Sequence, residues 1–429
     1  MPLPDLIEIV PLDKPVHAEI TVPGSKSITN RALALAALAD GETTLTGALW
    51  SEDTQVMVEC LQDLGFMVNV SPDPDEPCNR TITIYGKGGT IPGGGTVENP
   101  LELFVGNAGT AARFLSAMVC LGNGIYRLSG VPRMHERPQA ALFKALRELG
   151  YRVDSPNDKL PAVIHGTGPR ANAKCTVSIE ASSQFASALL LCEKHGDWDV
   201  NVVGENAEES PYVAMTSKLI EVFPQRGGRF QIEPDASSGS YFWAAGTLIP
   251  DDTVAVKAWP ESRWQFDSKF FPLYLHTHKS STVSRRTDLG DSIMTAIVIA
   301  PFYQHQSIFT DLGRLRVQEC ERVVALRTEL TKCGAKVVEE GDTLTVFPSQ
   351  LHGAEIETYN DHRIAMCFAI LGLKVPGIKL KNPTCVKKTF PNFFQKLAAA
   401  PPHGLGAEIW EVQNGQRTRR LSGDNLFAD

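Results

Sequence analysis

The sequence predicts an α/β protein built from copies of one structural unit, and two features of the chain indicate this class. The first is a phrase that recurs three times, in which an amphipathic helix ends at a glycine and a short run of β-type residues follows. The second is a set of strand-to-helix turns made of small residues. Because the copies lie far apart in the chain and strands and helices separate them, they indicate repeated α/β units and exclude a short-repeat solenoid.

The recurring phrase predicts where three helices end. The helix and its glycine occupy residues 59–65, 146–150 and 326–334. The β-type runs that follow them occupy residues 66–70, 151–153 and 335–338. Glycine directly after a helix adopts the left-handed conformation at no steric cost, so each copy is predicted as a helix, a glycine and a strand.

The strand-to-helix turns predict anion binding. Residues 20–23 are expected as a strand, 24–27 as a turn and 28–38 as a helix rich in alanine and leucine. Similar turns occupy 106–113 and 181–184. A helix opened by small residues presents unpaired backbone N–H groups beside the positive end of its dipole, an arrangement that suits an anionic ligand.

Size and charge narrow the class of protein. A chain of 429 residues is long enough for two or three compact domains, and its net charge of −8 argues against nucleic acid or a membrane surface as partner. The first residues show no basic region followed by an apolar core, and the nine cysteines are scattered without a Cys-x-x-Cys pair. We therefore expect a cytoplasmic protein with reduced thiols and no metal site.

Each charged motif also has a structural interpretation when it is taken alone. Residues 24–27 resemble a nucleotide-binding P-loop, but Lys26 follows a serine and the earlier glycine of that motif is missing, so a kinase or ATPase is not expected. The other structural interpretations are a solvated loop at 133–138, a helix N-cap at Asp361 or Asp291, a salt-bridged helix start at Glu319, Glu321 and Arg322, and surface histidines at His276 and His278.

The order of these motifs along the chain resembles the 5-enolpyruvylshikimate-3-phosphate synthase family, the 3-phosphoshikimate 1-carboxyvinyltransferases. The matching stretches cover nearly the whole chain: 23–32, 106–111, 132–138, 182–185, 235–238, 361–366 and 388–391. The related UDP-GlcNAc enolpyruvyl transferases share the fold but carry a reactive cysteine in a different loop. Residues 133–138 follow the shikimate-branch pattern.

The resemblance implies an α/β (α+β) two-domain enolpyruvyl transferase fold, with three repeated βαβαββ units in each domain around a cleft. One domain would span residues 24–238, and the other would combine 1–23 with 239–429. The implied reaction transfers the enolpyruvyl group of phosphoenolpyruvate to the 5-hydroxyl of shikimate 3-phosphate and releases phosphate. This is a step of the shikimate pathway to aromatic amino acids and a glyphosate target. The resemblance implies no metal or organic cofactor and a monomer.

The resemblance also assigns site residues by matching position. Phosphoenolpyruvate would be held by Lys26, Gly109, Arg137, Gln184, Arg322, Arg363 and Lys388. The acceptor would be held by Lys26, Ser27, Arg31, Ser182, Ser183, Gln184, Asp291, Arg314 and Gln318. Catalysis would fall to Lys26, Asp291, Glu319 and Lys388. Asp291 would take the proton of the acceptor hydroxyl, and Glu319 and Lys388 would move protons at the methylene and the leaving phosphate.

Three positions on the acceptor side depart from the family pattern. Glu209 stands where the family has a serine that helps to bind the 3-phosphate, unless a one-residue slip restores Ser210. Arg314 replaces an asparagine, and Gln318 replaces a lysine. A glutamate facing a phosphate is unfavourable unless a cation such as Arg314 compensates for it.

Three functions therefore stay open. The first is a divergent shikimate-pathway synthase that binds the phosphate through Arg314 and the two serines, and it is favoured because the residues for carboxylate and hydroxyl recognition are kept. The second is the same chemistry on a different hydroxylated carboxylate that lacks the 3-phosphate. The third is an inactive paralogue that only binds ligand, and the retained Lys26, Asp291, Glu319, Arg363 and Lys388 argue against it.

Overall fold

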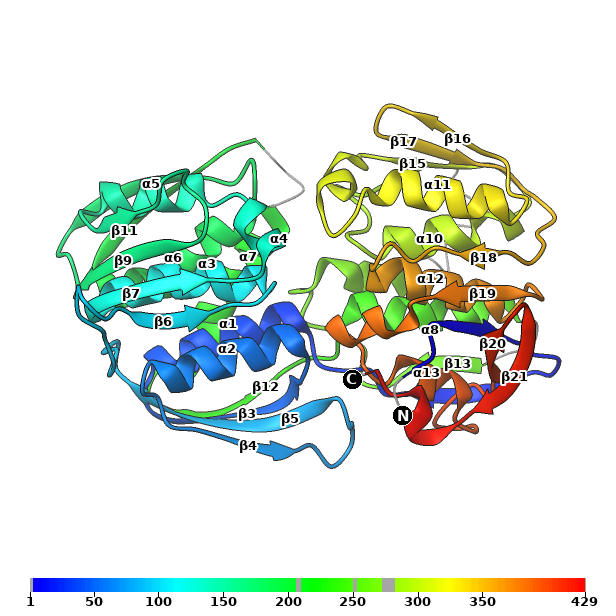
Figure 1. The fold of residues 1–429 in the computed structure, drawn as a ribbon, viewed down its shortest axis with the longest axis horizontal. Coiled ribbons are helices and arrows are strands. Elements are labelled where there is room, and N and C mark those ends of the chain that lie inside the picture. Colours follow the sequence, from blue (N-terminus) through cyan, green and yellow to red (C-terminus); the bar gives the residue numbers. More distant parts are fainter. Residues whose placement is uncertain (1–2, 206–209, 250–252, 272–281, 429) are drawn as a thin grey trace. The chain divides into compact units, whose positions relative to one another are not determined.

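The chain forms two compact units in the computed structural model, which describes residues 3–205, 210–249, 253–271 and 282–428. One unit is Gly24–Glu233, and the other combines Met1–Pro23 with Pro234–Asp429 and is called the split unit below. In both units buried helices are flanked by sheets (Figure 1).

Helices α1, α3 and α6 form the core of the 24–233 unit. Almost every residue of α1 and α3 is buried, and both helices consist mainly of alanine, leucine and other small or apolar residues. The helices of this unit are α1 (Lys26–Leu38), α2 (Glu52–Asp63), α3 (Gly109–Met118), α4 (Pro132–Glu136), α5 (Ala140–Glu148), α6 (Ser183–Gly196) and α7 (Ser210–Val222), with the 3-10 helix η1 (Val119–Leu121).

The sheets of this unit repeat one strand order. In the order β6-β7-β9-β8, the first pair is parallel and the other two are antiparallel, and β12-β3-β5-β4 has the same directions. The parallel strands β10 and β11 form a further pair. The strands are β3 (Asp40–Leu49), β4 (Val68–Pro72), β5 (Asn79–Lys87), β6 (Leu101–Phe104), β7 (Asn123–Ser129), β8 (Arg152–Asp154), β9 (Ala162–Thr167), β10 (Ala173–Ser178), β11 (Trp198–Val203) and β12 (Gly228–Gln231).

The split unit has the same organisation around α8, α10 and α12. Its helices are α8 (Ala236–Leu248), α10 (Ile293–Ile299), α11 (Arg322–Lys332), α12 (His362–Gly372) and α13 (Phe393–Ala398). Its 3-10 helices are η2 (Phe266–Lys269), η4 (Ala300–Phe302), η5 (Gly313–Val317), η6 (Pro383–Lys388) and η7 (Gly423–Leu426). Helix α12 is buried over almost its whole length.

The sheets of the split unit also repeat the βαβαββ pattern. The order β14-β15-β17-β16 matches that of β6-β7-β9-β8, and β18-β19-β1-β20-β21 is a similar unit into which the N-terminal strand β1 is inserted. The described part of the third sheet is the parallel pair β13 and β2. The strands are β1 (Leu6–Ile9), β2 (His17–Ile20), β13 (Thr253–Val256), β14 (Thr282–Ser284), β15 (Ser307–Thr310), β16 (Val337–Glu340), β17 (Thr343–Val346), β18 (Glu355–Ile356), β19 (Ile378–Lys381), β20 (Ile409–Gln413) and β21 (Gln416–Leu421). The predicted α/β class with repeated βαβαββ units is confirmed.

The three predicted helix-ending glycines occupy equivalent places in this repeat. Gly65, Gly150 and Gly334 have φ of +87°, +89° and +91° and follow α2, α5 and α11. In all three, the glycine N–H and the N–H after it donate to carbonyls of the last helical turn, as Gly150 does to Arg147 (2.9 Å) and Tyr151 does to Leu146 (3.0 Å). The strands that follow, β4, β8 and β16, are the end strands of equivalent sheets.

Two local predictions need correction. Residues 133–138 were expected as a loop, but most of them form the short helix α4, which starts at Pro132 because proline is preorganised for the first helical position. The predicted strand at 20–23 ends at Ile20, and the helix expected from Ile28 already starts at Lys26. His276 and His278 lie outside the described residues.

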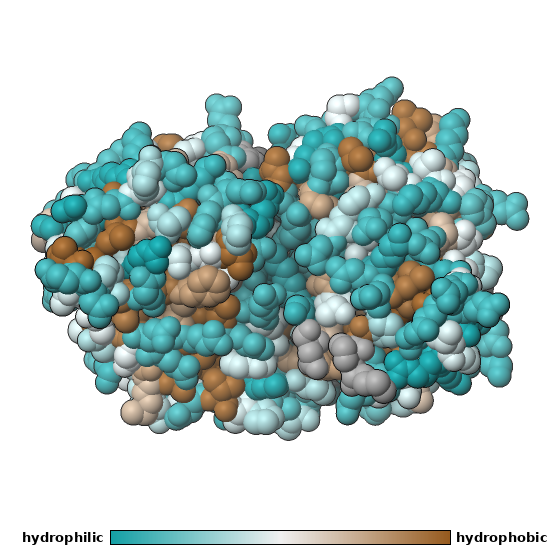
Figure 2. Space-filling view, in the orientation of Figure 1, coloured by the Kyte–Doolittle hydropathy of each residue, from teal (hydrophilic) through white to brown (hydrophobic). Residues whose placement is uncertain are grey.

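The face of the molecule drawn in Figure 2 is mainly hydrophilic, with apolar residues scattered over both units. None of the helices in the described segments has the length and apolar character that a membrane span requires.

Candidate active site

The predicted site residues fall into two groups, one in each unit. In the 24–233 unit, Lys26, Gly109 and Ser183 are the first residues of α1, α3 and α6. The first turns of these helices contain no acidic residue, and the N-cap residues of α1 and α3 form no side-chain capping bond. Their N-termini therefore keep the positive electrostatic character that favours an anion.

Lys26 is paired with a residue that the sequence analysis did not identify. Its Nζ lies 3.0 Å from Oδ2 of Asp53 on α2, and the carboxylate is nearly buried while the lysine is partly exposed. The pair holds the ammonium group at the start of α1. A lysine and an aspartate 27 residues apart give no local sequence signal, so only the fold reveals the contact.

Two arginines lie against the first turn of α3. A Cβ atom at Gly109 would lie 2.5 Å from Arg113 Nη1 and from Arg137 Nη2, so both guanidinium groups would have to shift to admit any side chain at this position. Arg137 donates to the carbonyl oxygen of Asn107 at 3.1 Å, and the buried Arg113 donates to those of Gly109 and Pro138. The loop before α3 and the residues after α4 are thereby joined.

The acceptor-side residues of this unit cluster around α6. Ser182 caps the helix by accepting from the Gln184 N–H at 3.2 Å, and the Gln184 side chain donates to Thr110 at 3.4 Å, which links the starts of α3 and α6. Ser183 is buried in the first turn of the helix.

Arg31 is more enclosed than its predicted role suggests. Its guanidinium donates to Thr216 (2.7 Å), to the Ser27 carbonyl oxygen (2.9 Å) and to Ser187 (3.0 Å), and the residue is 2% exposed. Burial lowers the pKa of Arg31 to about 10. The structure thus gives this arginine a definite packing role, because it ties α1 to α6 and α7.

In the split unit, Asp291 lies at the centre of a cluster of arginines. Its Oδ1 accepts from Arg285 Nη2 at 3.0 Å, and its Oδ2 is 3.2 Å from Arg363 Nη2 and 4.0 Å from Arg322 Nη1. Burial alone would raise the pKa of Asp291, but the charges of Arg363, Arg285 and Arg322 outweigh it and hold the pKa well below its usual range. Ser292, not Asp291, is the N-cap of α10, so the interpretation of Asp291 as a simple cap is wrong.

Arg322 connects Asp291 to the remaining predicted residues. Its guanidinium is 2.7 Å from Asp361 and 2.8 Å from Glu319, and Glu319 is in turn 3.2 Å from Lys388 Nζ. Gln318 accepts a short hydrogen bond from Arg322. This unit therefore brings together its predicted residues Asp291, Gln318, Glu319, Arg322, Arg363 and Lys388.

The alternative interpretations of the neighbouring acids are confirmed as local structure. Asp361 caps α12 by accepting from the Arg363 N–H at 2.8 Å, and Glu321 caps α11 by accepting from the Val324 N–H. The cap at Asp361 coexists with the cluster, because the Asp361 carboxylate also binds Arg322, whereas Glu321 pairs with Arg316.

Two of the divergent positions are placed and one is not. Arg314 lies in η5, and Gln318 directly follows that 3-10 helix. Glu209 lies outside the described residues, and Ser210 is the first residue of α7.

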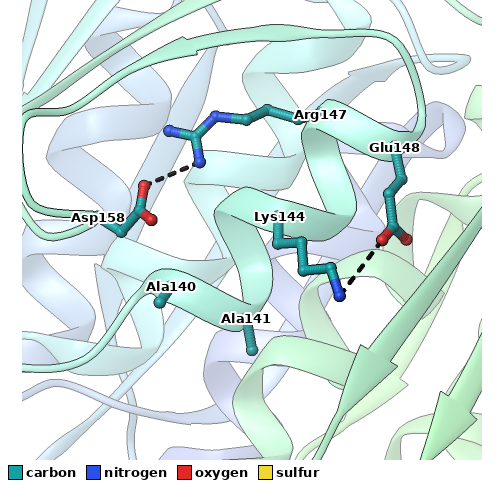
Figure 3. A pocket seen from close by; sticks show the side chains of 6 residues that line it. All are labelled: Ala140, Ala141, Lys144, Arg147, Glu148 and Asp158. Carbon is teal, nitrogen blue, oxygen red and sulfur yellow. Dashed lines mark hydrogen bonds and ion pairs between the residues drawn. The ribbon is translucent and has the colours of Figure 1, made fainter.

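A surface pocket over α5 contains none of the predicted residues. Figure 3 shows its charged side chains, which pair with one another: Arg147 with Asp158 at 2.8 Å, and Lys144 with Glu148 at 3.7 Å. Surface pairs of this kind carry no indication of a ligand.

Comparison with known proteins agrees with the architecture and with the family that the sequence resembles. The family model for EPSP synthase (3-phosphoshikimate 1-carboxyvinyltransferase) matches residues 11–226 and 220–397. The chain is 36% identical to a 3-phosphoshikimate 1-carboxyvinyltransferase of Trichormus variabilis, over 92% of this chain and 98% of the relative. It is 37% identical to one of Opitutus terrae, over 93% and 98%.

Solved structures support the same fold. The structure of EPSP synthase from Acinetobacter baumannii matches with a TM-score of 0.77 at 21% identity, covering 95% of this chain and all of that one. The enolpyruvyl transferase NikO from Streptomyces tendae matches with a TM-score of 0.68 at 14% identity, covering 95% and 99%. The chain therefore belongs to the EPSP synthase family and is an enzyme of the 3-phosphoshikimate 1-carboxyvinyltransferase class.

Proposed function

We propose that this enzyme transfers the enolpyruvyl group of phosphoenolpyruvate to the 5-hydroxyl of shikimate 3-phosphate through the residues described above. The observation that carries the proposal is the cluster in the split unit, where an ionised carboxylate, Asp291, adjoins Arg322 and Arg363 while Glu319 adjoins Lys388. One unit thus brings together a base for the acceptor hydroxyl, cations for phosphoenolpyruvate and a pair of residues for proton transfer.

Phosphoenolpyruvate, the donor of the enolpyruvyl group, is recognised by its negative charge. In this proposal the two compact units are the two enolpyruvyl transferase domains, and both contribute cations to phosphoenolpyruvate. Arg322, Arg363 and Lys388 come from the split unit, while Lys26 and Arg137 come from the other, with the backbone at Gly109 and the side chain of Gln184. Arginines present planar pairs of N–H groups that match phosphate and carboxylate oxygens.

The chemical step is an addition followed by an elimination. Asp291 takes the proton of the 5-hydroxyl as the hydroxyl oxygen bonds to C2 of phosphoenolpyruvate, and the methylene carbon C3 accepts a proton from the Glu319 and Lys388 pair. The intermediate then loses a proton from C3 and its phosphate from C2, which restores the C=CH₂ double bond. Proton transfer in the transition state by groups positioned in this way is general acid–base catalysis.

The acceptor is recognised mainly by the 24–233 unit in this proposal. Ser27, Ser182 and Ser183 lie at the starts of α1 and α6, where hydroxyl and backbone N–H donors suit a carboxylate or a phosphate. Arg31 would contribute through the donors that its contacts to Ser27, Thr216 and Ser187 leave, since those contacts use three of the five N–H groups of a guanidinium. Arg314 would add a cation from the split unit.

The direct test is release of inorganic phosphate from phosphoenolpyruvate, with shikimate 3-phosphate, shikimate and other hydroxylated carboxylates offered in parallel. We expect shikimate 3-phosphate to be strongly preferred and the product to carry one added enolpyruvyl ether. Lys26→Ala and Asp291→Asn are expected to abolish turnover, while Arg420→Gln, at an exposed surface ion pair, serves as a matched charge-removal control. A preference for an unphosphorylated acid would replace the acceptor in this proposal, and full activity of Lys26→Ala or Asp291→Asn would contradict the proposed site.

A further inference from the structure

Arg285 is a buried cation beside the proposed catalytic base, and the family resemblance assigned it no role. It follows the last residue of β14 and is 4% exposed, whereas the next residue, Arg286, is exposed. An arginine is buried only when other groups compensate for its charge, because removing a cation from water costs several kcal/mol. The carboxylate of Asp291, 3.0 Å from Arg285 Nη2, supplies that compensation.

The backbone around Arg285 is held in place by hydrogen bonds. The Arg285 N–H donates to the Thr310 carbonyl oxygen at 3.1 Å, which extends the pairing of β14 with β15. Ser284 and Asp288 close a turn over it, because the Ser284 N–H donates to the Asp288 carboxylate at 2.8 Å and the Asp288 N–H donates to the Ser284 carbonyl oxygen at 3.0 Å. The guanidinium is thus presented to Asp291 from a fixed position.

The two oxygens of Asp291 have different partners. Oδ1 accepts from Arg285, while Oδ2 faces Arg363 at 3.2 Å and Arg322 at 4.0 Å. The proposed function assigns Arg322 and Arg363 to the anionic donor, and Arg285 is not among the residues proposed to meet substrate. When the donor binds, the charges of Arg322 and Arg363 are shared with its phosphate and carboxylate. The contact with Arg285 does not have to change.

The other charged groups near Asp291 do not take over this role. Asp267 binds the N–H and hydroxyl of Ser292, directly after Asp291, and Asp235 and Asp267 act on Arg363 through their charge. Glu319 and Asp361 bind Arg322. All of these groups are carboxylates, so each of them opposes ionisation of Asp291 and increases the need for a lasting cation.

We propose that Arg285 is a positioning residue that holds Asp291 in one orientation and keeps it ionised during turnover, leaving Oδ2 for the acceptor hydroxyl. This inference rests on the proposed function, because it takes Asp291 as the base and Arg322 and Arg363 as donor ligands. Loss of the positive charge next to Asp291 raises the pKa of Asp291. The fraction of Asp291 that is ionised then falls at low pH, and kcat falls with it.

The test compares Arg285→Gln, Arg285→Lys and the control Arg286→Gln, using phosphate release from phosphoenolpyruvate and shikimate 3-phosphate across a pH series. In Arg285→Gln we expect kcat to fall roughly 10- to 100-fold, as for other misplacements of a catalytic group, with a KM for phosphoenolpyruvate within about twofold of wild type. The acidic limb of the kcat profile should move to higher pH. Arg285→Lys should return that limb toward the wild-type position, and Arg286→Gln should leave kcat and the profile unchanged.

Either of two pH profiles would overturn the role of Arg285: an unmoved acidic limb in Arg285→Gln, or a limb in Arg285→Lys displaced as far as in the glutamine variant. The lysine variant also keeps the test decisive if the glutamine variant does not fold, because a displaced limb there contradicts the charge argument. Failure of the wild-type enzyme to release phosphate would instead refute the proposed function. A wild-type rate in Arg285→Gln, with Asp291→Asn inactive, would refute the positioning role alone.

Discussion

Asp361 offers a prediction whose magnitude follows from its contacts, because one buried carboxylate has two separable roles. It is 0% exposed, accepts from Arg322 Nε at 2.7 Å and Nη2 at 3.3 Å, and caps α12 through the Arg363 N–H at 2.8 Å. Asparagine keeps one side-chain oxygen, which can still accept from the Arg363 N–H, but its NH₂ group replaces the oxygen that accepts from Arg322 Nε and the charge is lost. Alanine removes both roles.

The expected costs differ accordingly. Loss of an N-cap costs about 0.5–2 kcal/mol, and removal of one partner from a buried ion pair costs about 3–5 kcal/mol, so Asp361→Ala should lose at most about 4–7 kcal/mol of the free energy of unfolding. Asp361→Asn should lose about 1–3 kcal/mol, since Glu319, at 2.8 Å, still compensates for the charge of Arg322. The alanine loss approaches the whole stability of a typical domain, about 5–15 kcal/mol.

Equilibrium unfolding in urea, followed by circular dichroism on the full chain, measures these costs. We expect the midpoint to fall from wild type to Asp361→Asn to Asp361→Ala. Asp342→Asn is the matched control, because its ion pair with Arg316 is solvent-exposed and should cost no more than about 1 kcal/mol. An alanine variant within about 1 kcal/mol of the wild type would refute the argument that Asp361 compensates for a buried arginine.

The remaining predictions concern two glycines and an inhibitor. Gly109→Ala should raise the KM for phosphoenolpyruvate without loss of stability. The new Cβ would lie 2.5 Å from the side-chain ends of Arg113 and Arg137, which can move aside. An unchanged KM would show that Arg137 does not bind phosphoenolpyruvate. Gly150→Ala should cost about 1–2 kcal/mol in thermal or urea unfolding from backbone strain alone, since φ is +89° and the added Cβ meets nothing within 4 Å. Glyphosate should inhibit competitively against phosphoenolpyruvate in initial-rate assays, and insensitivity of the wild type would show a reshaped donor site.

Much of the fold could be predicted because it is encoded locally. A glycine that must adopt positive φ marks the end of α2, α5 and α11 in any context, and buried helices such as α12 show as continuous apolar runs. Pairings between distant segments leave no such signal. The insertion of β1 between β19 and β20 and the pairing of β12 with β3 depend on contacts between residues far apart in the chain.

The same difference between local and distant information applies to the candidate site. Matching position in the family assigned Glu319, Arg322 and Arg363 to the site, and the structure brings these residues together around Asp291. Their counter-charges were not identified as such, because the Lys26 and Asp53 pair joins two helices and Arg285 lies in a turn that resembles no family motif. A residue whose role is to compensate for a charge can come from any neighbouring element, so position in the sequence does not constrain it.

The exposure of three carboxylates in the split unit distinguishes Asp361 from the two acids of the proposed mechanism, Asp291 and Glu319. Asp361 has no exposed side-chain surface, whereas the side chain of Asp291 is 12% exposed and that of Glu319 is 25% exposed, although all three contact Arg322. A buried carboxylate cannot leave its arginine without leaving a buried charge uncompensated, so the contact between Asp361 and Arg322 is costly to break. The two more exposed carboxylates can give up part of their contact with the arginine to an anionic ligand at lower cost. Asp291 and Glu319 are also the acids to which the proposed mechanism assigns proton transfer.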